Sequence, residues 1–152
     1  EQLRFENSFD FDLVVDKNIS QYETQVPSML IQPYVENAIW HGLMNLENER
    51  KGVLRLDVCL NQGMLQITIK DNGIGRAKAG TYNKDEKHKS VGMKLTEQRL
   101  LMINKMQEFG SAKVEVTDLY NTNKESEGTR VVINLPMEVE HSSLHYKAID
   151  EK

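Results

Sequence analysis

The sequence predicts a mixed α/β (α+β) domain in which a mainly antiparallel sheet carries its helices on one face. Two observations lead to this prediction. Strand-like runs occur in two successive pairs, each joined by a polar connector, which is typical of β-hairpins. Two segments whose apolar residues recur at helical spacing separate these runs. Because hairpins dominate the connections, we expect a two-layer fold whose second sheet face is left to solvent or to a partner.

The expected strands are runs in which apolar and polar residues alternate, since successive side chains of a strand point to opposite faces. "FDFDLVVD" begins the series. "VLRLDVCL" and "MLQITIKD" are separated by "NQG", which favours a tight hairpin, and "YNTNKESEG" joins the last pair. The predicted strands are residues 9–16, 53–60, 64–71, 112–119 and 129–136.

Two helices are expected, over residues 33–44 and 93–109. Pro33 either starts the first helix or kinks it, because it has no N–H to donate. Gly110 is a stop signal for the second helix, and the Gly- and Lys-rich residues 72–92 between the helices are expected to form a long loop. On the first helix we expect one face in the core and a polar face opposite it. The core face would hold Ile31, Val35, Ala38 and Gly42, and the polar face Tyr34, Asn37, His41 and Met44.

Length and composition predict one domain. With 152 residues, of which 39% are hydrophobic, the chain fits a domain over residues 1–137 followed by a loose C-terminal tail, 138–152. The net charge of -4 argues against a nucleic-acid partner, and no apolar run approaches the roughly 20 residues of a membrane span. Cys59 is the single cysteine, so no internal disulfide can form. Because the chain does not begin with Met, we expect it to be a fragment of a longer protein.

Two motifs carry candidate ligand-binding groups. Asn37 offers an amide oxygen of the kind that Mg²⁺ prefers, and a solvent-facing helical Asn is the alternative. In "IKDNGIGR", Asp71 ends a strand, and Gly73 and Gly75 let the backbone approach a ligand closely. As an acceptor, Asp71 suits an exocyclic amine such as that of adenine. A plain Asp-Asn-Gly turn is the alternative here.

A basic segment follows these motifs. Between Arg76 and Lys89 there are five Lys or Arg residues and two Asp or Glu residues, which suits polyphosphate, although a solvated loop has the same composition. Gly92 opens the second helix, whose free N–H groups can bind phosphate, or is a loop glycine without function. The four histidines and Cys59 lack metal-ligand spacing, and neither a phosphate-binding Gly-x-x-x-x-Gly-Lys-Ser/Thr loop nor a serine nucleophile elbow is present.

In order along the chain, "QPYVENAIWHG", "DNGIG", "SVGMKLTEQRL" and "GTRVVINLP" resemble the ATP-binding domain of sensor histidine kinases. The resemblance is to the LytS-type family, within the superfamily of gyrase, chaperone, histidine kinase and mismatch-repair ATPases. It covers residues 1 to 137 and implies the Bergerat-type α/β sandwich, with ATP and Mg²⁺ as cofactors. Residues 76–91 would form the ATP lid.

The resemblance also implies roles for single residues. Asn37 would bind Mg²⁺, Asp71 would receive the adenine amine, and the glycines would shape the pocket. Trp40 stands where many relatives carry a phosphate-binding Lys, so His41 or a lid Lys would take that part. Glu36 would polarise the attacking imidazole. The implied nucleotide-binding residues are Asp71, Gly73, Gly75, Lys89, Gly92, Met93 and Thr129, and the implied catalytic residues are Glu36, Asn37 and His41.

The implied activity is that of a protein-histidine kinase. The domain would donate the γ-phosphate to a histidine on an upstream helix, whose motif this chain lacks, and that histidine would phosphorylate a response regulator. The whole protein would be a homodimer at the inner membrane, with this domain in the cytoplasm. Two alternatives stay open. One is a signalling module without kinase activity, because the second glycine box is reduced to Gly92. The other is a gyrase- or chaperone-type ATPase, although Pro33 stands at the position of its general base.

Overall fold

The computed structural model describes residues 9–20, 24, 26–27, 29–46, 50–82, 96, 98–102, 104–105 and 111–137. The predictions for Lys89, Gly92 and Met93 concern residues outside these ranges, as does the predicted tail. The domain boundary at residue 137 therefore stays a prediction.

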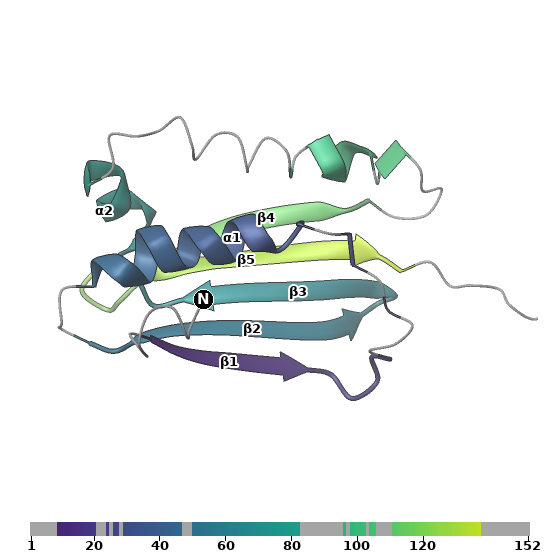
Figure 1. Ribbon diagram of the computed structural model, residues 1–152, viewed down its shortest axis with the longest axis horizontal. Coiled ribbons are helices and arrows are strands. Elements are labelled where there is room, and N and C mark those ends of the chain that lie inside the picture. Colours follow the sequence, from purple (N-terminus) through teal and green to yellow (C-terminus); the bar gives the residue numbers. More distant parts are fainter. Residues whose placement is uncertain are drawn as a thin grey trace, which may run out of the picture.

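Within the described residues the strands form one five-stranded sheet in the order β1-β2-β3-β5-β4 (Figure 1). β1 and β2 are parallel, and the other neighbouring pairs are antiparallel. The parallel pair follows from its connection, because the chain crosses the sheet through a helix before returning as β2. This arrangement confirms the predicted mixed, mainly antiparallel sheet. The strands are β1 (Phe9–Val15), β2 (Gly52–Asn61), β3 (Met64–Asp71), β4 (Lys113–Tyr120) and β5 (Ser126–Pro136).

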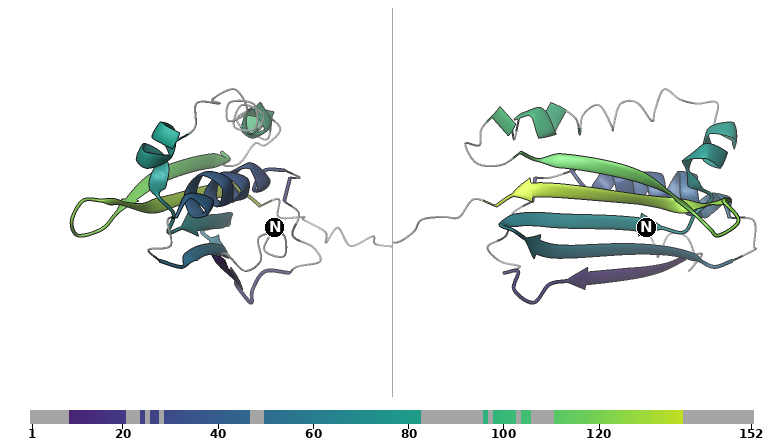
Figure 2. Two further views of the ribbon diagram at one scale, coloured as in Figure 1. Left: turned by 60° about the vertical axis from the view of Figure 1, so that its left-hand side comes forward. Right: turned by 180° about the vertical axis from the view of Figure 1, so that it is seen from behind.

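The first predicted helix is present over its whole predicted length, as three consecutive helical segments. α1 (Gln32–Asn37) continues through a π-helical turn (Ala38–Gly42) and a 3-10 turn (Leu43–Asn45). Pro33 lies in the first turn, where its missing N–H removes no helical hydrogen bond. Seen from behind in Figure 2, the sheet lies in front of α1, as expected for a helix layer on one face.

A further helix, α2 (Gly75–Tyr82), lies within the segment that was predicted to be a loop. That prediction was wrong over these residues. Gly75 has a φ of 74°, which lets the chain turn sharply out of the strand, and Arg76 to Ala79 are strong helix formers. The Gly and Lys content of residues 72–92 favours a loop, but the helix propensity of Arg76 to Ala79 prevails over residues 75–82. Residues 96, 98–102 and 104–105 are helical, which confirms the predicted helix at 93–109 where it is described.

The core fills the space between α1 and the sheet. On β3, Leu65, Ile67 and Ile69 are at most 1% exposed. Burying each such aliphatic side chain contributes roughly 1.5 to 3 kcal/mol. Because the side chains of a strand alternate, Asp71 continues this series and points to the same buried side. The strand that supplies the centre of the core therefore also brings a carboxylate into the interior.

Candidate functional site

A cavity of about 450 Å³ lies where the core ends, between the helices and β3, β4 and β5. Its walls are mainly apolar and include Ile69, Val116 and Val131. Polar residues from α1, the π-helical turn, β3, α2 and β5 line it. Five of the residues predicted to form the site line this cavity: Asn37, His41, Asp71, Gly75 and Thr129. Segments distant in the sequence are thus brought together around one space.

Asp71 is the buried polar group of the cavity wall. It is 4% exposed, and its Oδ1 accepts a hydrogen bond of 2.9 Å from the backbone N–H of Gly73. Burial raises the pKa of Asp71 to about 6, and hydrogen bonds from the backbone of Gly73 and Thr129 counteract that rise. At neutral pH the side chain is therefore mainly a carboxylate, which only accepts hydrogen bonds.

At Gly73 the loop after β3 packs closely against the backbone of Gly42, near the end of the first helix. A Cβ built on Gly73 would lie 2.4 Å from the carbonyl carbon of Gly42, so no larger residue fits. The N–H of Ile74 donates to the oxygen of Gly42 at 3.2 Å. Gly73 is not among the residues that line the cavity. Its geometry holds Asp71 beside the helix, and Gly42, predicted only as a core residue, is its partner.

The helix presents a different face to the cavity from the one predicted. Tyr34, expected on the polar side, is 6% exposed and belongs to the core. Ala38 and Gly42, expected on the opposite side from Asn37 and His41, line the cavity with them. The reason is that the cavity lies between helix and sheet, so its wall and the core form one continuous surface. The predicted separation into opposite faces was wrong.

Glu36 lies outside this cavity. It is exposed, and its Oε1 accepts a hydrogen bond of 2.7 Å from Nε2 of Gln32. Trp40, one turn later, is 44% exposed. Of the three predicted catalytic residues, Asn37 and His41 line the cavity and Glu36 does not.

Arg76 is a cavity residue that the sequence analysis placed only within a basic segment. From the start of α2 its guanidinium donates to both carboxylate oxygens of Asp118 on β4, at 2.6 and 2.8 Å. Hydrogen bonds from Arg76 lower the pKa of Asp118. The pair ties α2 to β4 beside the cavity. Its members are far apart in sequence, so no local pattern signals the contact.

This fold is that of histidine kinase catalytic domains. The catalytic domain of the histidine kinase ThkA superimposes with a TM-score of 0.55 and 12% identity, covering 89% of this chain and 87% of that domain. The histidine kinase domain of the blue-light activated histidine kinase from Erythrobacter litoralis gives a TM-score of 0.56 and 19% identity, covering 85% of this chain and 52% of that one. At such identities these likenesses define the fold alone.

Sequence comparison adds relatives among the sensor kinases. Sensor histidine kinase YpdA of Escherichia coli is 35% identical over 75 residues, 49% of this chain and 12% of that protein. Sensor protein LytS of Staphylococcus epidermidis is 32% identical over 75 residues, with the same two shares. Sensor histidine kinase BtsS of Escherichia coli is 30% identical over 100 residues, 66% of this chain and 16% of that protein. No family model matches the chain.

These comparisons confirm the resemblance seen in the motifs. The chain is related to LytS-type and other sensor histidine kinases and has the fold of a histidine kinase catalytic domain. It spans 12 to 16% of the length of these curated relatives. Among the described helices, none is long and apolar enough to span a membrane.

Proposed function

We propose that this chain is the Mg·ATP-binding catalytic domain of a two-component sensor histidine kinase. The observation that carries the proposal is the buried Asp71 carboxylate in the wall of an apolar cavity. An acceptor there suits the exocyclic amine of adenine. The apolar walls suit a flat purine ring, and the relation to sensor histidine kinases supports the same assignment.

The phosphates would lie toward Asn37 and His41. We propose that the Asn37 amide oxygen ligates Mg²⁺ and that His41 contacts phosphate, with Thr129 beside the nucleotide. Mg²⁺ is held in such sites by one or two side chains together with substrate phosphates, so a single Asn fits the ion. Among the described residues, no group of three His, Cys, Asp or Glu side chains is placed to hold a metal alone. The bound ion would neutralise phosphate charge.

The remaining parts of the site lie outside the described residues or outside the chain. Lys89, Gly92 and Met93 are proposed to bind the nucleotide at the end of the lid. The acceptor would be a histidine on an upstream helix of the whole protein, and a response regulator would receive the phosphoryl group next. Glu36 is exposed, so an imidazole on that helix can reach its carboxylate. The whole protein is proposed to be a homodimer at the inner membrane, with this domain in the cytoplasm.

Hydrolysis of ATP is less well supported than transfer. A hydrolase needs a general base that activates water. Pro33 stands at the position where the ATPase relatives carry that base, and Asp71 is the only acid among the described residues that line the cavity. Asp71 is assigned to adenine. The geometry therefore favours a phosphoryl acceptor that comes from outside the cavity.

Nucleotide binding can be tested by thermal unfolding of the 152-residue chain with Mg·ADP. A ligand that binds only the folded state stabilises it by about 2.7 kcal/mol at a hundredfold excess over its Kd. We expect Tm to rise for the wild type, and to rise much less for Asp71→Ala at the same concentration. Asp57→Ala is the matched control, because Asp57 is paired with Arg55 away from the cavity. An unchanged wild-type Tm at millimolar Mg·ADP would refute the proposal.

Phosphotransfer needs a longer chain that contains the upstream helix. With radiolabelled ATP we expect label on that chain, loss of label in Asn37→Ala, and no label on the 152-residue chain alone. Binding of nucleotide without label on the longer chain would point instead to a signalling module that lacks kinase activity.

A further inference from the structure

We propose that Arg50 is a positioning residue that orients the Asp71 carboxylate through the peptide between Asn72 and Gly73. The inference rests on the proposed hydrogen bond from the adenine amine to Asp71. It adds the residue that holds the Asp71 carboxylate in position. Arg50 precedes β2, lies outside the recognised motifs, and does not line the cavity.

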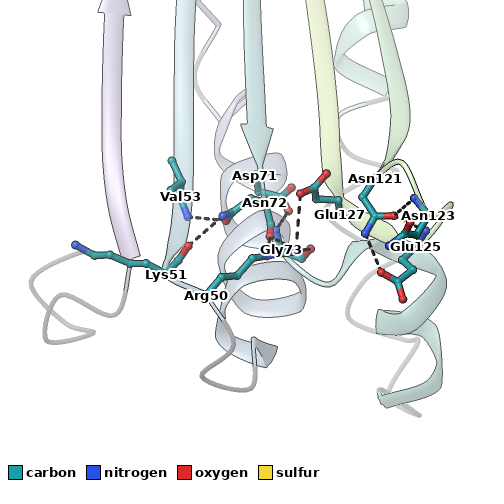
Figure 3. A network of polar contacts seen from close by, with 10 residues as sticks. All are labelled: Arg50, Lys51, Val53, Asp71, Asn72, Gly73, Asn121, Asn123, Glu125 and Glu127. Atoms are coloured by element: carbon teal, nitrogen blue, oxygen red, sulfur yellow. Dashed lines mark hydrogen bonds and ion pairs between the residues drawn. The ribbon is translucent and has the colours of Figure 1, made fainter.

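The Arg50 guanidinium is bound to the loop that follows β3 (Figure 3). Its Nε and Nη2 donate to the carbonyl oxygen of Asn72 at 3.2 and 2.8 Å. Nη2 also donates to the carbonyl oxygen of Gly73 at 3.1 Å. The planar fork of Arg suits this arrangement, since several N–H groups reach neighbouring acceptors at once. Arg50 therefore fixes two successive carbonyl groups directly after Asp71.

One of these carbonyls belongs to the same peptide unit as the amide that binds Asp71. The Asn72 C=O and the Gly73 N–H share one plane and point in opposite directions, because a trans peptide is rigid. On one side the carbonyl accepts from Arg50, and on the other the N–H donates to Asp71 Oδ1 at 2.9 Å. A cation on the carbonyl polarises the peptide and strengthens the bond that its N–H donates. Arg50 thus controls the direction and the strength of the contact that holds the carboxylate.

The Asn72 side chain holds the same loop from a second direction. Its Oδ1 accepts from the Val53 N–H at 2.6 Å, and its Nδ2 donates to the Lys51 oxygen at 3.0 Å. These bonds anchor the Asn72 side chain to Lys51 and to β2, and neither of them is made by the peptide between Asn72 and Gly73. The contact between Arg50 and Glu127 measures 4.0 Å, and both side chains are at least 36% exposed. Such an exposed ion pair contributes little to stability, so we argue the role of Arg50 from its hydrogen bonds to the two carbonyl groups.

The test compares two nucleotides that differ along the base edge that carries the amine. In Mg·ADP the exocyclic amine can donate a hydrogen bond to Asp71, whereas in Mg·IDP a carbonyl oxygen stands in its place and N1 carries a proton. Calorimetric titration of the 152-residue chain gives the ratio of their dissociation constants. We expect Arg50→Ala to reduce the preference for ADP roughly tenfold, the equivalent of one hydrogen bond to a charged group. A merely structural role would weaken both nucleotides equally and leave the ratio unchanged.

Three variants separate positioning from charge and stability. Arg55→Ala removes the same charge from an Arg that is bound to Asp57 away from the cavity, and should leave the ratio unchanged. Glu127→Gln removes the weak ion pair and should also leave it unchanged. Arg50→Lys keeps the cation without the fork and should give an intermediate ratio, which provides a readout even if Arg50→Ala does not fold.

The possible results distinguish this inference from the proposed function. Equal binding of ADP and IDP by the wild-type chain would overturn the proposed hydrogen bond between Asp71 and the adenine amine. It would overturn the role of Arg50 as well. A wild-type preference that persists undiminished in folded Arg50→Ala or Arg50→Lys would overturn the role of Arg50 alone. A preference lost equally in Arg55→Ala would also overturn it, because overall charge would then explain the effect.

Discussion

Replacing Asp71 by Asn should remove a pH-dependent cost that the buried carboxylate imposes on folding. The pKa of Asp71 is about 6 in the folded chain, against its ordinary value of 3.8. The folded state therefore holds the proton more tightly than the unfolded state. Stability falls as pH rises from about 4 to 6, and the full cost, about 3 kcal/mol, is present above that range. Asn has no proton to lose in this range, so Asp71→Asn lacks this contribution.

The measurement is the free energy of unfolding in urea, at pH 5.0 and at pH 7.5. Titration of Asp71 should remove about 1.4 kcal/mol from the wild type between these two values and nothing from Asp71→Asn. All other titrating groups are common to both proteins, so they cancel in the comparison. Equal pH dependence in wild type and Asp71→Asn would show that Asp71 keeps its ordinary pKa in the folded chain, and would refute the reasoning.

Three further predictions concern the surroundings of the site. Gly73→Ala places a Cβ against the helix backbone and should cost about 1 to 3 kcal/mol of unfolding free energy in urea. Gly63→Ala has only the backbone strain of a φ of 78°, because its Cβ meets nothing within 4 Å, and should cost less; a smaller loss in Gly73→Ala than in Gly63→Ala would contradict the packing argument. Arg76→Ala breaks a partly exposed ion pair with Asp118 and should cost about 1 kcal/mol or less, shrinking in 1 M salt; a loss independent of salt would argue against an electrostatic origin. Asn72→Ala leaves the Val53 N–H of β2 without its acceptor and should cost about 1 to 3 kcal/mol of unfolding free energy, with faster hydrogen exchange at the Val53 amide; unchanged exchange at that amide would contradict the prediction.

The strands were predictable because the alternation of side chains is a local signal. β3 ends where predicted, at Asp71, and β5 begins only a few residues before the predicted Thr129. α2 was missed because a helix of eight residues that begins Gly-Arg-Ala-Lys-Ala has no apolar stripe, and its buried residues among 75–79 are the small Gly75 and Ala79. Hydrophobic periodicity in a sequence arises because one face of an element is buried. An element that buries few apolar side chains therefore has no clear periodic pattern.

The residues that line the cavity were predictable mainly where a short motif concentrates them. Asn37 and Asp71 each lie in a short motif, and both line the cavity. Arg50 and Arg76 act on partners that the fold brings close from distant positions, at Gly73 and Asp118. Such contacts depend on strand order and register, which one sequence does not reveal.

The order of strands also sets when this pocket can exist during synthesis. β3 lies between β2 and β5, although α2 and β4 separate β3 from β5 along the chain. A domain generally folds as a unit, so it needs its full set of strands before it is complete. The wall that Thr129 and Val131 contribute belongs to β5, which pairs with the central strand β3 and is the last of the described strands to be synthesised. Nascent chains that end before β5 lack part of the cavity wall, so the proposed nucleotide would stabilise only a chain whose synthesis has passed β5.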